Sequence, residues 1–209
     1  NEFSYSLQLR FQLLVMLVRL AHSIQEVNIL QKAALLIFRT KWNIDRVYSA
    51  EFIDFQIEVA CLLAESFSVR ITSEKKNLMP IKNLNNIDLL NYFSLGTEFP
   101  EINEDLLKMK KLVIASMEKA FRLSIMRKDI YAVQNVLTYF WNLHLHLFKD
   151  YSQFSTCIKE VFEFIKFTIS SIDSILSFPG VSTSFEPKIF LNFMNVYSIY
   201  AEVNLLQPQ

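Results

Sequence analysis

Glycine is almost absent from this chain, which contains only Gly96 and Gly180 among its 209 residues. Proline is also scarce, at 5 residues. Tight β-hairpins and phosphate-binding loops depend on backbone conformations that glycine adopts most easily, so both have little room here. Hydrophobic residues make up 52% of the chain and recur mainly at helical spacing. The sequence therefore predicts an all-α fold of long helices joined by short connections.

The clearest helical feature is a pair of segments within residues 107–149, joined by a turn at Arg127-Lys128-Asp129. Apolar residues of the first segment recur at spacings typical of one buried helix face: Leu107, Ile114, Met117, Ala120, Phe121 and Ile125. The second segment, residues 130–148, contains no Asp, Glu, Lys or Arg. A helix that is apolar on most sides is usually enclosed by neighbours, so we expect this one at the centre of the fold.

Five further helices are predicted by the same periodicity, at residues 7–23, 25–40, 45–72, 151–177 and 186–206. The first of these carries an apolar stripe formed by Leu9, Leu13, Met16, Leu17 and Leu20. The third carries an inner stripe formed by Ile53, Ile57, Ala60, Ala64, Phe67 and Ile71. Successive helices joined by short turns lie antiparallel. We therefore predict helical hairpins that form an α-solenoid or an irregular helical bundle; because no fixed repeat period is present, any tetratricopeptide-like (TPR-like) array would be degenerate.

One long segment interrupts the helical pattern. Residues 73–103 are rich in Asn and include Pro80, Gly96 and Pro100, which favour turns. Long connections of this kind are uncommon inside compact domains and are often insertions or binding segments. We therefore divide the chain into an N-terminal helical part (1–72), a linker or insertion (73–103) and a C-terminal helical part (104–209). Because the sequence starts with Asn1 and not with Met, we expect it to be a portion of a longer chain.

Charge and cysteine usage narrow the range of partners and compartments. The 21 basic and 21 acidic side chains balance, and a chain without basic excess is not expected to bind nucleic acid. Polar residues within 130–148, such as Asn135 and Asn142, make a position inside a bilayer costly, so no membrane partner is expected. Cys61 and Cys157 are far apart in apolar helical contexts, which predicts buried free thiols in a reducing, intracellular compartment.

Patterns that carry catalysis or bind cofactors are missing from the sequence. His144 and His146 form the closest histidine pair, but side chains two positions apart on a helix diverge by about 200° and cannot both bind one metal ion. The isolated His22 is interpreted in the same way, as a polar position in a packed helix. Phosphate-binding loops, nucleophile motifs and magnesium-binding carboxylate clusters are not found. We expect a protein that is not an enzyme and that uses no metal or cofactor.

Two groups of residues are candidates for contacts with other proteins. Four carboxylates share one face of the third predicted helix: Glu51, Asp54, Glu58 and Glu65. This face is either a docking surface for a basic partner or a solvated face. Trp141 and Asn142 lie within the apolar helix, where the indole N–H and the amide both need hydrogen-bond partners. They fix either the packing of neighbouring helices, which we favour, or an interface with another protein.

Two strings within the predicted hairpin resemble a segment of the large helical-repeat, TPR-like cilia- and flagella-associated proteins of the axonemal central apparatus: Val133-Gln134-Asn135 and Tyr139-Phe140-Trp141-Asn142-Leu143-His144. The resemblance covers this hairpin alone. It implies a non-catalytic scaffold of the ciliary cytoskeleton that binds other axonemal subunits in a large hetero-complex. It supplies packing positions and no active-site residue.

The sequence leaves two other functions open. The first is a helical adaptor outside cilia, in vesicle tethering or transport. The second is an all-helical enzyme or carrier of an apolar ligand, with a cavity near Phe162, Phe164 and Phe167. Cellular localisation would separate the first from a ciliary scaffold, and a copurifying small molecule would indicate the second.

Overall fold

The computed structural model describes residues 2–39, 49–78, 104–149, 158–178 and 186–206. Within these ranges the chain is helical, with short turns and no strand. The predicted all-α class is therefore confirmed. None of the described helices combines enough length and hydropathy to cross a lipid bilayer.

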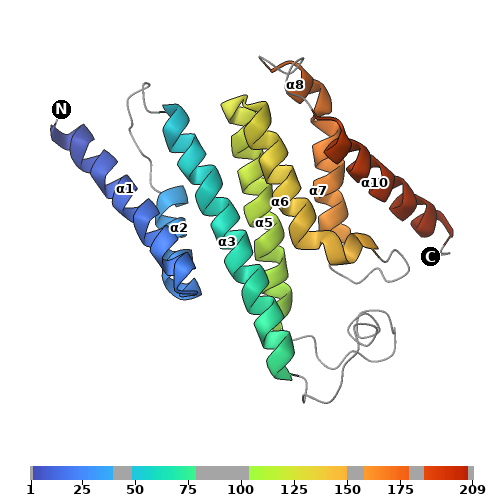
Figure 1. Cartoon of the computed structure of the whole chain (residues 1–209), viewed down its shortest axis with the longest axis horizontal. Helices are drawn as coiled ribbons and strands as arrows, with labels where there is room; N and C mark the ends of the chain where they lie inside the picture. The colour runs from blue at the N-terminus through green and yellow to red at the C-terminus, as the bar shows by residue number, and fades with distance from the viewer. Residues whose placement is uncertain (1, 40–48, 79–103, 150–157, 179–185, 207–209) are drawn as a thin grey trace.

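The described helices stand side by side in an elongated row, with the two ends of the chain at opposite ends of the row (Figure 1). Their bounds are α1 Glu2–Ser23, α2 Val27–Arg39, α3 Ser49–Leu78, α5 Glu104–Arg127, α6 Ile130–Lys149, α7 Ile158–Ser170, α8 Ile172–Leu176 and α10 Lys188–Leu206. Helices α1 and α2 pack on α3, α3 packs on α5 and α6, and α10 packs on α6 and α7. The long helices that follow one another along the chain run in opposite directions (Figure 1), which gives the predicted helical hairpins.

Non-glycine residues make the two short turns that the structure describes. Gln25 between α1 and α2 has φ 59°, and Lys128 between α5 and α6 has φ 56°. This left-handed conformation at a helix C-terminus is usually taken by glycine, which the chain lacks at both places. Asp129 then caps α6, because its carboxylate Oδ1 accepts hydrogen bonds from the backbone N–H groups of Tyr131 (2.9 Å) and Ala132 (3.3 Å). The turn predicted at residues 127–129 is therefore confirmed.

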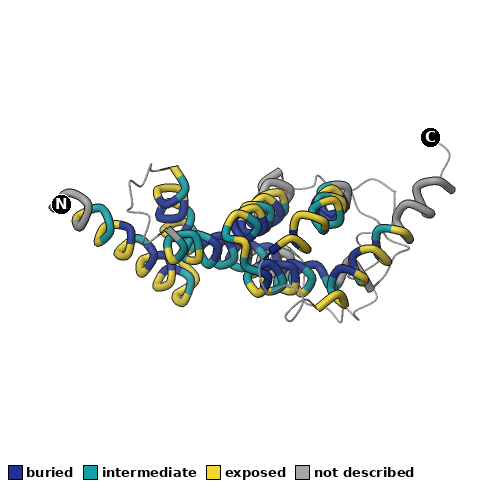
Figure 2. Tube along the Cα trace, turned by 90° about the horizontal axis from the view of Figure 1, so that it is seen from above, coloured by how far each residue is buried: buried dark blue, intermediate teal, exposed yellow. Residues whose placement is uncertain are grey.

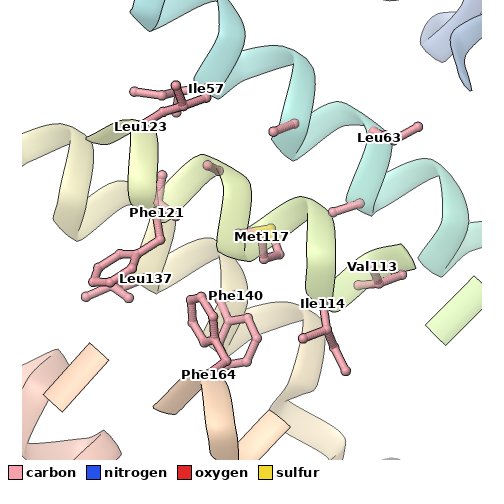
Figure 3. Packing of buried hydrophobic residues seen from close by; sticks show 14 of the residues in the cluster. Ile57, Leu63, Val113, Ile114, Met117, Phe121, Leu123, Leu137, Phe140 and Phe164 are labelled. Atoms are coloured by element: carbon pink, nitrogen blue, oxygen red, sulfur yellow. The ribbon is translucent and has the colours of Figure 1, made fainter. Parts of the chain in front are cut away.

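A continuous apolar core runs from α1 to α10. At its centre Phe140 of α6 lies 4.1 Å from Phe164 of α7 between ring centroids, and Phe121 of α5 makes an edge contact with Phe164 at 5.6 Å. Figure 3 shows these rings, with Ile57 of α3 against Leu123 of α5 nearby. The predicted inward positions with described side chains are confirmed in α5, apart from the half-buried Ile125, and in α3, apart from the half-buried Ile53. The side chain of Leu107 lies outside the described residues.

Helix α6 is not enclosed on all sides, contrary to its predicted central position. One face buries apolar residues such as Val133 and Phe140, but Asn135, Thr138 and Asn142 are exposed. Lack of charge in this helix was a poor guide to burial, because threonine and asparagine provide its solvent-facing side. The middle of the row is shared by α3, α5 and α6.

Helix α1 buries a different face from its predicted apolar stripe. The stripe residues Leu9, Leu13, Met16, Leu17 and Leu20 are 39–61% exposed. The buried side is formed instead by Phe11, Val15, Val18 and Ala21. The helix has apolar residues on two opposite sides, and periodicity alone cannot choose which of them meets the core.

Two helix boundaries also differ from the prediction. Helix α3 continues to Leu78, so residues 73–78 of the expected linker are helical, and the rest of that segment lies outside the described residues. The single helix expected at 151–177 is divided at Ser171 into α7 and α8, and residues 151–157 are not described. Hydroxyls just before the break bond to earlier carbonyls, with Thr168 donating to Phe164 O (3.0 Å) and Ser171 to Phe167 O (2.8 Å). Such side-chain bonds compete with the helical ladder and bend it.

Candidate functional site

The acidic face of α3 is the polar centre of the molecule, and it lies where other helices reach α3. Arg19 of α1 binds Glu58 through two parallel hydrogen bonds, from Nε to Oε1 and from the second guanidinium nitrogen to Oε2, both 2.7 Å. This fork raises the pKa of Arg19, chiefly through the hydrogen bond with Glu58. The Arg19 guanidinium also lies 5.4 Å from the ring centroid of Phe55. The pair therefore links α1 to α3 at the edge of their apolar contact.

Glu65, two turns further along α3, joins three helices. The hydroxyl of Tyr139 in α6 donates a short hydrogen bond to Glu65 Oε2. His22 of α1 places its Nε2 at 3.2 Å from the same oxygen. Burial, and then the bond to Glu65, raise the pKa of Tyr139 well above its usual range. The Tyr139 hydroxyl therefore stays protonated and acts as the donor of the hydrogen bond to the Glu65 carboxylate.

Asp54 anchors a fourth helix to the same face, because its Oδ1 accepts a hydrogen bond from Arg127 Nε of α5 at 3.1 Å. Three of the four predicted acidic residues are therefore engaged inside the chain, and Glu51 is exposed. The sequence alone left two interpretations of these residues, a docking surface or a solvated face. The structure shows a further role: Asp54, Glu58 and Glu65 hold α1, α5 and α6 against α3.

Cys61 lies on α3 between Glu58 and Glu65 and is a half-buried free thiol. Burial raises the pKa of this thiol to about 12, with smaller contributions from the two carboxylates. A thiol that keeps its proton is a poor nucleophile and a poor metal ligand. Cys61 is a free thiol as predicted, but it is half-buried and not fully buried, and Cys157 lies outside the described residues.

Two of the groups around Glu65 have pKa values that burial raises. A general acid or base works best with a pKa near the working pH, but those of Tyr139 and Cys61 are shifted away from neutrality. Within the described ranges, no group of three or more His, Cys, Asp or Glu side chains is placed to bind a metal ion. The contacts around Glu65 link α1, α3 and α6.

His144 packs against Phe140 of its own helix, whereas Trp141 packs against a neighbouring helix. His144 is buried, its Nδ1 lies 2.9 Å from the Phe140 carbonyl oxygen, and its ring lies 4.3 Å from the Phe140 ring. Trp141 is half-buried with its ring centroid 5.5 Å from that of Phe193 in α10. This contact supports the packing interpretation of Trp141, while Asn142 is exposed. The side chain of His146 lies outside the described residues.

A second surface was not recognised as exposed from the sequence. Nine of the sixteen exposed large hydrophobic residues in the described chain lie between Leu9 and Leu36, at one end of the row. Six of them form what we call the α1 outer face: Leu9, Leu13, Met16, Leu17, Leu20 and Ile24. Exposed positions follow one side of α1 along its length in Figure 2. The sequence does contain an indication of this exposed surface, because apolar residues occupy two opposite sides of the helix and only one side can meet the core.

Comparison with known proteins adds no assignment. No protein-family model, curated protein or solved structure matches this chain.

Proposed function

We propose that this chain is a non-catalytic scaffold segment whose exposed helical faces bind other proteins. The observation that carries the proposal is the α1 outer face, a row of large apolar side chains on the first helix of the array. Helices in such arrays are covered by their immediate neighbours, and a helix side that faces water is normally polar. An apolar outer side on α1 supports a further protein surface packed against it.

The energetic argument uses the exposed fraction of these residues. Full burial of a Leu or Met side chain contributes about 1.5–3 kcal/mol, so covering the exposed half of each contributes about 1 kcal/mol. Leu13, Met16 and Leu20 are 56, 61 and 57% exposed. Six such residues contribute about 6 kcal/mol, which is at the low end of the about 4–15 kcal/mol that association costs, so a stable complex also needs charged or polar contacts around the apolar row.

We place the scaffold in the central apparatus of motile cilia as the more specific proposal. Its support is the resemblance of the 133–144 segment to axonemal helical-repeat proteins. Val133 and Phe140 of this segment are buried, and Trp141 packs on α10. These are packing positions of a helical hairpin, so an adaptor in vesicle tethering or transport would use them equally well, and location in the cell separates the two.

A ligand carrier receives less support from the aromatic cluster. The expected cavity residues Phe164 and Phe167 are in ring contact with Phe121, at 5.6 and 5.5 Å. Phe164 also lies 4.1 Å from Phe140. These rings fill the interior between α5, α6 and α7, as in an ordinary core.

Crosslinking mass spectrometry on the tagged full-length protein, purified from its native source, tests the scaffold proposal. We expect crosslinks from Lys32, on the outer hairpin, to lysines of other proteins. Crosslinks confined to the protein itself, together with a bound metabolite, would contradict the scaffold and support a carrier. Fluorescence imaging of the same tagged protein tests the location separately, since absence from cilia would remove the ciliary assignment and leave the scaffold in place.

A further inference from the structure

The α1 outer face has the geometry of a surface that receives one helix. Leu9, Leu13, Met16 and Leu20 follow one another along α1 at intervals of three and four residues, and Ile24 continues this row in the turn just past the end of the helix. At about 1.5 Å per residue the row extends about 22 Å, or four helical turns. All five residues are 46–61% exposed, whereas Phe11, Val15 and Val18 on the opposite side are at most 3% exposed. Helices that bind helices use anchors at this spacing.

Most charged residues of the α1–α2 hairpin are basic. From residue 3 to residue 25 the chain contains Arg10 and Arg19 and no Asp or Glu. Helix α2 carries Lys32 and Arg39, again without an acidic residue, and Glu26 in the turn is the one carboxylate of the hairpin between residues 3 and 39. Arg19 is neutralised by Glu58, but Arg10 is exposed beside the row. An occupant with acidic side chains next to its apolar stripe would complement this surface.

We propose that the α1 outer face binds an amphipathic helix of another protein, with apolar residues at intervals of three and four flanked by Asp or Glu. This inference rests on the proposed scaffold function and names the chemistry of one partner. A second copy of the chain fits less well, because between residues 3 and 39 it offers a single carboxylate, Glu26, against Arg10, Arg19, Lys32 and Arg39. A lipid surface also fits less well, because helices that lie on membranes have a polar face rich in Lys and Arg. The corresponding side of α1 is apolar and packs on α3.

Direct binding tests the proposal on the purified 209-residue protein. The probes are two synthetic 21-residue helical peptides with the same leucine stripe, one flanked by Glu and the other by Lys, followed by fluorescence anisotropy. We expect the Glu-flanked peptide to bind at least roughly tenfold more tightly than the Lys-flanked one. The double variant Leu13→Gln and Leu20→Gln should weaken that binding by roughly tenfold or more. Arg10→Glu should reduce the preference for the acidic peptide.

A matched control keeps the result specific to this face. Leu191 on α10 is 59% exposed, so Leu191→Gln makes the same chemical change on the far end of the row and should leave binding unaltered. All variants are at exposed positions, and circular dichroism should show unchanged helix content and melting.

Three outcomes would overturn the proposal. They are no binding of the acidic peptide, equal binding of both peptides, or binding unaffected by the Leu13/Leu20 double variant. Concentration-dependent dimerisation lost in the double variant would assign the face to a second copy, and flotation with vesicles of phosphatidylserine and phosphatidylcholine would assign it to lipid. Any of these results would leave the scaffold function standing if crosslinks to other proteins arise elsewhere on the chain, so the two proposals fail separately.

Discussion

The α5–α6 hairpin and the α1–α2 hairpin are both antiparallel helix pairs, but they are held in the molecule in different ways. Helices α5 and α6 are covered on two sides, by α3 and by α7 and α10, and their contacts are large aromatic and aliphatic side chains such as Phe121, Leu137 and Phe140. Helix α1 is covered on one side, by a seam of mostly smaller residues that includes Val18 and Ala21, with polar pairs at its edge. Stability therefore concentrates in the middle of the row, while the end keeps its apolar surface available for binding.

Phe140→Ala is the largest test of this difference. Phe140 is fully buried and contacts rings in α7 and α10, so removing its ring leaves a cavity where three helices meet. We expect a loss of about 3–5 kcal/mol in the free energy of unfolding, measured by urea denaturation. Leu13→Ala on the α1 outer face is the matched control, and it should change the free energy of unfolding by no more than about 0.5 kcal/mol. Similar losses for the two variants would remove the distinction between core and outer face.

Trp141→Ala should have an intermediate effect. Because Trp141 is half-buried against Phe193, we expect a loss of about 1–3 kcal/mol, below that of a fully enclosed aromatic residue. The conservative variant Trp141→Phe should recover most of the loss by keeping an aromatic ring in contact with α10. A neutral result in urea denaturation, with loss of partner binding, would show that Trp141 belongs to an intermolecular interface.

Tyr139→Phe tests whether the polar contacts hold the end of the row to its middle. The variant removes the hydroxyl that donates to Glu65, so the half-buried carboxylate loses this hydrogen bond while His22 Nε2 stays 3.2 Å away. We expect a loss of about 1–2 kcal/mol in thermal or urea unfolding. Glu65→Gln keeps an acceptor oxygen for the hydroxyl and should cost less. If Tyr139→Phe is neutral, α6 is held by its apolar contacts alone.

The free energy of unfolding at alkaline pH tests the burial of Cys61, which lies on the same face of α3. Its pKa rises on folding from an ordinary value of 9.0 to about 12, so the folded state keeps a proton that the unfolded chain loses. The resulting stabilisation is complete below pH 9 and is lost as the pH rises towards 12. The free energy of unfolding should decline over this window, with this group contributing less than about 1.4 kcal/mol per pH unit. Cys61→Ala should show a shallower decline, and an unchanged slope would contradict the assigned burial of the thiol.

Arg19→Ala should produce the smallest change. The Arg19–Glu58 fork is well aligned, but the two side chains are 49 and 36% exposed, so solvent screens the pair and its contribution is about 1 kcal/mol or less. A double-mutant cycle with Glu58→Gln isolates the pair, and its coupling should shrink in high salt. Hydrogen exchange should be faster at α1 amides than at α6 amides, and faster still in Arg19→Ala. Equal protection of α1 and α6 would contradict the comparison of the two hairpins.

Much of the helical architecture was predictable because it depends on local rules. The α5–α6 hairpin follows from periodicity and from a capping aspartate at Asp129, which act within a few residues. The partners of the α3 carboxylates were not predictable, because Glu58 meets Arg19 from 39 positions away and Glu65 meets Tyr139 from 74 positions away. No local pattern encodes which helices will become neighbours.

The candidate binding face shows a related limit. The apolar stripe of α1 was found, but its exposure was not, because two opposite apolar sides satisfy the same periodicity. The side that meets α3 is decided by the shapes of Phe11, Val15 and Val18 against their neighbours, including a Phe11–Phe52 ring contact at 4.4 Å. The break between α7 and α8 was not predicted either. It depends on side-chain hydroxyl groups, whereas the apolar periodicity of this segment indicates one continuous helix.

Helices α1 and α10 stand at opposite ends of the row (Figure 1), and this arrangement has a mechanical consequence. A force applied to the two ends would pass through the helix–helix interfaces one after another, so every interface would carry the same tension. The α1–α2 hairpin, held by its one-sided seam and its edge pairs, would yield at the lowest force. The aromatic interfaces of α5, α6 and α7 would remain closed until the force rose further.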